Sequence, residues 1–141
     1  MTTYSEAGAN DTDIALYIAQ NPQCVNVLCL PVKIWAARQN SELVALLLLK
    51  TAPYISLDLY TIQPETRPFM RMFKLLHKAE EWLQKHAVPM VCIAIHNSNR
   101  HFQALVRRLG YAECGNELYE NGIENSTIYA KYFTVKDSVL H

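Results

Sequence analysis

The chain has 141 residues, a formal net charge of zero and an apolar share of 50%, which suits one domain with a substantial core. A neutral protein lacks the long-range field that concentrates polyanions, so we expect no nucleic-acid partner. The longest apolar run, Leu43 to Leu49, is far shorter than the ~20 residues of a membrane-spanning helix, so we expect no membrane span.

The N-terminal segment and the cysteines bear on the cellular compartment. The segment MTTYSEAGANDTD lacks a basic stretch followed by an apolar one, so we expect no secretion signal. The cysteines show neither a C-x-x-C pair nor the spacing of zinc ligands; they are Cys24, Cys29, Cys92 and Cys114. Most of them lie in strand-like apolar runs, where a reduced, buried thiol is the simplest interpretation. These features favour a cytoplasmic protein without a metal site.

The first half of the chain predicts one helix followed by an antiparallel meander. A short edge strand is expected around Tyr4, and Ile14, Tyr17 and Ile18 have helical spacing up to Pro22. Asn10 to Thr12 offers helix caps. Strand-like segments follow at residues 24–30, 32–38, 42–50 and 54–62. Because Asn40-Ser41 supplies a turn, the second and third of these segments are expected to form a hairpin.

The second half of the chain predicts two helices on either side of a buried strand. Apolar residues recur at helical steps from Phe69 to Leu83 and again from Phe102 to Leu109. Met90 to Ile95 is typical of a strand that is buried on both faces.

The ends of the last helix and the final hairpin carry local signals. Ser98 or Asn99 is a candidate N-cap, and Gly110 occupies the position that ends helices in the left-handed conformation. Segments 113–119 and 126–134 are predicted to be two strands joined by a turn at 120–122.

Two motifs in this half give a more specific signal. One motif precedes the helix predicted at residues 69–83 and reads Ile62-Gln63-Pro64-Glu65-Thr66-Arg67. The other consists of Asn99 and, further along the chain, Gly110-Tyr111. Both resemble the GCN5-related N-acetyltransferase (GNAT) family, whose usual form is a V-x-P-x-x-R-G-x-G-x-G loop, a long helix, a strand, and N-x-x-A-x-x-x-Y-x-x-x-G-F. The centre of each motif differs from the family. The loop glycines fall on Pro68, Met70 and Met72, the alanine on Phe102, and the tyrosine on Val106.

The resemblance implies an α/β fold in a single domain, residues 1–141. Its central twisted sheet would be mostly antiparallel, with a splayed parallel pair and helices on both faces. The family normally places two helices before the meander, whereas only a few residues separate the first helix from Cys24 here. We therefore expect the acceptor side of the site to be remodelled or open.

The resemblance also implies acetyl-CoA as cofactor. In the family, the pantetheine arm pairs with backbone groups beside the splayed strands, and the pyrophosphate rests on the amides of the loop. The matching positions are Ile62, Gln63, Arg67, Phe69, Met70, Arg71, Met72 and Asn99. Pro68 removes one N–H donor, while Arg67 and Arg71 offer charge to a diphosphate. Alternatively, the arginines are solvated, Phe69 and the methionines simply pack, and Asn99 only caps its helix.

Catalysis in this family is direct attack of an amine on the thioester, which uses a base and often an acid. Asp58 is the preferred base, since its strand face is polar. The alternative is that the Asp58 carboxylate acts as a cap or pairs with a nearby basic side chain. Val106 cannot replace the usual tyrosine, which leaves Tyr111, Tyr119 or Cys92 as substitutes. His96 ends the second strand of the splayed pair, where it either titrates beside the thioester or hydrogen-bonds to a loop.

Two functions follow from these patterns. The first is an acetyl-CoA-dependent N-acyltransferase that acts on a small-molecule or protein amine. The second is a non-catalytic scaffold of the same fold that binds other protein subunits. Small degenerate acetyltransferase-like proteins occur among the internal virion proteins of short-tailed phages. This sequence, with arginines around a Pro-Phe-Met loop and without the usual tyrosine, is similar to them in that respect. A protein of that kind would be virion-associated.

Overall fold

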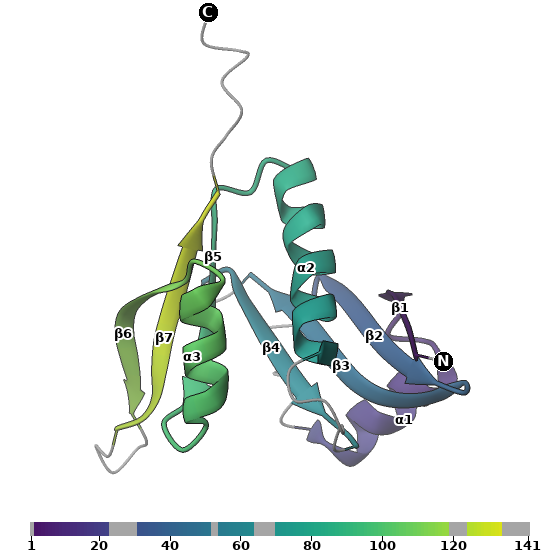
Figure 1. Ribbon diagram of the computed structural model, residues 1–141. Helices are drawn as coiled ribbons and strands as arrows, with labels where there is room; N and C mark the ends of the chain where they lie inside the picture. The colour runs from purple at the N-terminus through teal and green to yellow at the C-terminus, as the bar shows by residue number, and fades with distance from the viewer. Residues whose placement is uncertain (1, 23–30, 52–53, 64–69, 119–123, 134–141) are drawn as a thin grey trace, which may run out of the picture. The chain divides into compact units, whose positions relative to one another are not determined.

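The computed structural model describes residues 2–22, 31–51, 54–63, 70–118 and 124–133. In these ranges the chain forms three helices and seven strands (Figure 1). The chain divides into two compact units, Met1–Ala79 and Glu80–His141. Helix α2 (Met70–Lys85) begins in the first unit and ends in the second.

The first unit contains an antiparallel four-stranded meander. Its strands are β1 (Thr2–Ala7), β2 (Lys33–Gln39), β3 (Glu42–Lys50) and β4 (Ser56–Thr61), each paired with the next. The predicted edge strand and hairpin are confirmed. Asn40 and Ser41 both have positive φ, 52° and 68°, which is the backbone of a primed two-residue turn that matches the twist of its strands.

Helix α1 (Thr12–Gln20) packs on one face of this meander. Ile14 is fully buried in a core cluster with Ile34, Ala36, Leu43, Leu46 and Leu48. Tyr17 and Ile18 pack against the same cluster, so the predicted helical stripe is the face that contacts the sheet. Nearly every residue of β3 is buried, as expected for a strand covered on both faces.

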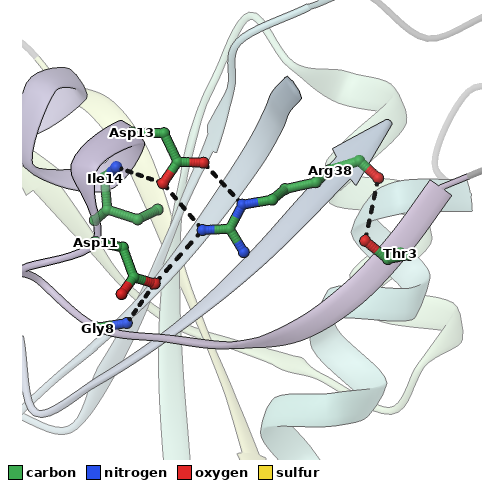
Figure 2. Close-up of polar contacts among 6 residues, drawn as sticks. All are labelled: Thr3, Gly8, Asp11, Asp13, Ile14 and Arg38. Carbon is green, nitrogen blue, oxygen red and sulfur yellow. Dashed lines mark hydrogen bonds and ion pairs between the residues drawn. The ribbon is translucent and has the colours of Figure 1, made fainter. Parts of the chain in front are cut away.

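An ion pair anchors the start of α1 to β2 (Figure 2). Arg38 donates from Nε to Asp13 Oδ2 at 2.8 Å and from Nη2 to Asp13 Oδ1 at 3.0 Å. Asp11 is the N-cap residue of α1, but its side chain makes no capping bond. Instead, Asp11 accepts the backbone N–H of Gly8 at 3.1 Å and lies 3.5 Å from Arg38 Nη2. The predicted cap position is confirmed, and its side chain stabilises the preceding turn.

The second unit contains an antiparallel three-stranded sheet and α3 (Arg100–Arg108). Its strands are β5 (Met90–His96), β6 (Ala112–Leu118) and β7 (Glu124–Tyr132), with β7 in the middle. Val91, Cys92, Ile93 and Ile95 are buried, which confirms the prediction of a buried strand.

Both ends of α3 follow the sequence signals. Asn99 Oδ1 accepts the N–H of Phe102 at 3.3 Å, so Asn99 is the N-cap. Gly110 has φ of 96°, and the N–H of Tyr111 donates back to Val106 at 2.9 Å. A left-handed glycine after the helix satisfies its last carbonyl groups in this way.

Three predictions about secondary structure lie outside the described residues. These are the strand at 24–30, the turn at 120–122, and the absence of a second helix before the meander, which concerns residues up to Cys24. In the part of the chain that is described, no helix is both long and apolar enough to cross a membrane.

Candidate functional site

Asp58, the predicted base, lies on β4 in an ion pair with Lys50. The register places Leu48 opposite Asp58 and Lys50 opposite Ser56, so Lys50 and Asp58 are diagonal neighbours on one face. Lys50 Nζ lies 2.7 Å from Asp58 Oδ2, and the two side chains are 11% and 31% exposed. The pairing that the sequence left as an alternative is therefore present. The catalytic role of Asp58 stays a prediction, and an amine that approaches this carboxylate must share it with Lys50 or displace Lys50.

A bulge ends the pairing of β4 with β3. Ala45 opposite Thr61 is the last regular pair. Beyond it, the N–H groups of Ile62 and Gln63 both donate to the carbonyl of Val44, at 2.9 and 3.2 Å. Two residues opposite one bend the strand and change the direction of its groups. Since both N–H groups are used within the protein, cofactor contacts at Ile62 and Gln63 would rest on their carbonyl groups and side chains.

Arg71 fixes the first turn of α2 against this bulge. Its Nη1 donates to the Gln63 carbonyl at 2.8 Å, and its Nη2 donates to Gln39 Oε1 at 3.0 Å. One guanidinium thus joins the end of β2, the bulge after β4 and the start of α2. A guanidinium has five N–H donors, so this role is compatible with the predicted contact to a phosphate.

Only some of the other predicted loop residues lie among the described residues. Arg67 and Phe69 lie outside the described residues. Met70 is 42% exposed and Met72 is half-buried, so packing alone does not account for Met70. Of the candidate loop, only the two ends lie among the described residues: the bulge at Ile62-Gln63 and the first turn of α2.

His96 is bound to the turn that follows β5. The Ser98 backbone N–H donates to His96 Nδ1 at 3.1 Å, and Ser98 Oγ lies 2.7 Å from the same nitrogen. Because Nδ1 accepts a backbone N–H, the neutral ring carries its proton on Nε2. His96 is exposed, and its carbonyl accepts the N–H of Asn99 at 2.9 Å. The structure thus brings His96 and Asn99 together in one turn, with Asn99 capping α3.

Tyr111 is a poor candidate for the acid. It is 3% exposed, and its hydroxyl donates to Glu80 Oε2 at 2.8 Å. Burial, the Glu80 charge and this hydrogen bond raise the pKa of Tyr111 far above its ordinary value of 10. Lys131 Nζ lies 2.8 Å from the other Glu80 oxygen. These three side chains tie α2 to β7 within the second unit.

Of the other two candidates for the acid, Tyr119 lies outside the described residues. Cys92 is buried, and burial raises the pKa of its thiol.

The sequence reasoning missed three residues that bind predicted site residues: Lys50 and Gln39 in the first unit, and Glu80 in the second. Lys50 had a usable signal, because a meander register that pairs Leu48 with Asp58 puts Lys50 on the same face. Gln39 and Glu80 had none, since their partners are 32 and 31 residues away in the chain.

Comparison with known proteins shows the fold. No family model and no curated protein matches the sequence. Solved structures do match.

The ribosomal-protein-S18-alanine N-acetyltransferase from Escherichia coli has 20% identity and a TM-score of 0.72, and the match covers 100% of this chain and 99% of that one. An IAA acetyltransferase from Bacillus cereus has 15% identity and a TM-score of 0.72, with coverage of 94% and 100%. A GNAT family acetyltransferase from Elizabethkingia anophelis, solved with acetyl-CoA bound, has 13% identity and a TM-score of 0.66, with coverage of 94% and 98%. The chain therefore has the GNAT acetyltransferase fold, and the predicted α/β fold class is confirmed.

Proposed function

We propose that the protein is an N-acyltransferase that moves an acetyl group from acetyl-CoA to an amine of a small molecule or a protein. The observation that carries the proposal is a fold shared over the entire chain with the N-acetyltransferase from Escherichia coli. The bulge after β4, held by Arg71, adds to it. The proposal would place the protein in the cytoplasm.

The residues on the two flanks of the candidate loop fit a ligand that carries a diphosphate. Arg71 provides fixed positive charge at the start of a helix, where the dipole also favours anions. The carbonyl groups of the bulge at Ile62 and Gln63 suit an extended amide-containing chain. When bound, acetyl-CoA supplies the acetyl group as a thioester.

The reaction needs the chain to bind the amine and take its proton. In the proposed mechanism, the amine nitrogen forms a bond to the thioester carbonyl carbon, the carbon–sulfur bond breaks, and CoA leaves as the thiolate, which takes up a proton from solvent. Asp58 takes the proton that the amine loses. Lys50 holds the Asp58 carboxylate in place before the amine arrives. His96 and Asn99 remain predicted contacts.

Calorimetric titration with acetyl-CoA and with free CoA tests the binding step. We expect micromolar affinity, and Arg71→Ala should weaken it about tenfold, which corresponds to about 1.4 kcal/mol for a lost charge-assisted contact. Gln39→Ala removes one anchor of the guanidinium but keeps its charge, so it should weaken binding less. Arg108→Ala removes an exposed charge from the last turn of α3 and should leave the affinity unchanged.

The alternative function, a non-catalytic scaffold, predicts the opposite outcome of this titration. No specific observation among the described residues favours it. A lack of binding at millimolar acetyl-CoA would overturn the proposed reaction and would leave a protein that acts through contacts with other subunits.

A further inference from the structure

Two cysteines that the proposed function does not use lie on one face of the sheet in the second unit. Ala130 in the middle strand β7 pairs with Cys92 on β5 and with Ala112 on β6. Paired residues point to the same face. Cys92 and Ala112 therefore flank the small side chain of Ala130.

A bulge brings Cys114 to the same place. On β6, Glu113 pairs with Tyr129 and Gly115 pairs with Ile128, so Cys114 is an extra residue with no partner in this register. A bulge re-aims the side chain of its extra residue. The thiol of Cys114 thereby comes close enough to act on that of Cys92, and it adds to burial in raising the pKa of Cys92. Both cysteines are free, with Cys92 buried and Cys114 exposed.

The strand spacing disfavours a direct disulfide between these thiols. Neighbouring strands lie about 4.8 Å apart, so β5 and β6, with β7 between them, are roughly 9.6 Å apart. A disulfide requires Cα atoms within about 7 Å. Joining the two sulfur atoms would therefore require the sheet to deform, whereas an ion between them would not.

The number of ligands restricts the kind of ion. Among the described residues, no group of three or more His, Cys, Asp or Glu side chains is placed to hold a metal. Ions that need three or four protein ligands, such as zinc, are therefore a poor match. Thiolates prefer soft ions such as Cu(I), and Cu(I) is stable with two ligands in a line. With metal–sulfur bonds of about 2.3 Å, an ion in a line between the two sulfur atoms would hold them about 4.6 Å apart.

We propose that Cys92 and Cys114 form a two-thiolate site for a soft monovalent cation, with Cu(I) as the representative ion. Each thiol releases its proton to solvent and forms one sulfur–metal bond, so one cation replaces two protons and no electron is transferred. Cys114 gives access from solvent, while Cys92, which is 5% exposed, keeps water from the other side. The bound ion links β5 to β6 across β7 and so stabilises the sheet of the second unit.

Anaerobic titration of the reduced protein with Cu(I), in competition with a chromophoric Cu(I) chelator, tests the site. We expect one ion per chain. Cys92→Ser and Cys114→Ser should each weaken binding about a hundredfold or more, because one thiolate alone is a poor competitor. The matched control is the double variant Cys24→Ser/Cys29→Ser, which keeps the proposed pair and should bind like the parent.

A thermal readout covers the case in which the buried Cys92→Ser does not fold. Since a ligand that binds only the folded state raises stability, Cu(I) should raise the Tm of the Cys24→Ser/Cys29→Ser variant and leave the Tm of Cys114→Ser unchanged. Three results would overturn the proposal: unchanged stoichiometric binding in Cys114→Ser, no binding in the double variant, or a Cys92–Cys114 disulfide formed by that variant in air. None of these results depends on acyl transfer.

Discussion

At the residue scale, the Lys50–Asp58 pair decides how the proposed base works. Lys50 is nearly buried and its ammonium touches the carboxylate at 2.7 Å. A buried charge that loses its partner is costly, so the two side chains must be tested together. The pair stabilises the β3–β4 hairpin and also occupies the carboxylate that the amine would use.

Asp58→Asn should affect both stability and rate. It leaves the Lys50 ammonium with a neutral partner, so we expect a loss of about 1–2 kcal/mol in the free energy of unfolding, measured by urea denaturation. The double variant Asp58→Asn/Lys50→Met should recover most of this loss. Acetyl transfer should become slower in Asp58→Asn while affinity for acetyl-CoA stays the same. An unchanged rate would remove Asp58 from the mechanism. A double variant as unstable as Asp58→Asn would show that the stability loss does not come from the unpaired Lys50 ammonium.

At the element scale, the sequence predicted what is encoded locally. The turn at Asn40-Ser41, the Asn99 cap and the left-handed Gly110 each depend on a few adjacent residues, so the residue types alone were sufficient. The helical stripes were visible for the same reason. The contacts that shape the site were not visible, because Arg71 with Gln39 and Tyr111 with Glu80 depend on how distant segments pack.

The anchor between α1 and β2 predicts a dependence on pH. The hydrogen bonds and charge of Arg38 hold the pKa of Asp13 below its ordinary value of 3.8, against the opposing effect of burial. A carboxyl with a lowered folded-state pKa stabilises the fold above its unfolded pKa, and this contribution is lost as the pH falls through the folded-state value. Because Asp13 is 35% exposed, solvent screening limits the pair to about 1 kcal/mol.

Comparison of Asp13→Asn with the parent chain tests this anchor. The variant should be less stable by about 1 kcal/mol near pH 7, measured by urea denaturation. The difference should shrink as the pH falls below 3.8, where the parent carboxyl also becomes protonated. A difference that stays constant from pH 7 to pH 3 would show that Asp13 acts through something other than its charge.

At the scale of the whole molecule, the fold was predicted better than the reaction. The apolar stripes gave the helices and strands, and the resemblance of two motifs to a known family gave a fold that the structure shares with acetyltransferases at 20% identity or less. The residues that differ from the family pattern fall in the two motifs to which the resemblance assigns cofactor binding and proton transfer; they are Pro68, Met70, Met72, Phe102 and Val106. Because differences in these motifs leave the packing of the core intact, the fold could be predicted from the sequence with more detail than the reaction could. The predicted splayed strand pair remains a prediction, since β4 and β5 belong to different units.

The most direct test of the proposed acyl transfer uses hydroxylamine as a small general acceptor, so that the natural amine need not be known. The parent chain is mixed with acetyl-CoA and hydroxylamine, and acetohydroxamate and free CoA thiol are both quantified. The account predicts equal amounts of the two products, formed faster than in buffer and more slowly with Asp58→Asn. Product formation no faster than in buffer, by a chain that binds acetyl-CoA, would contradict it.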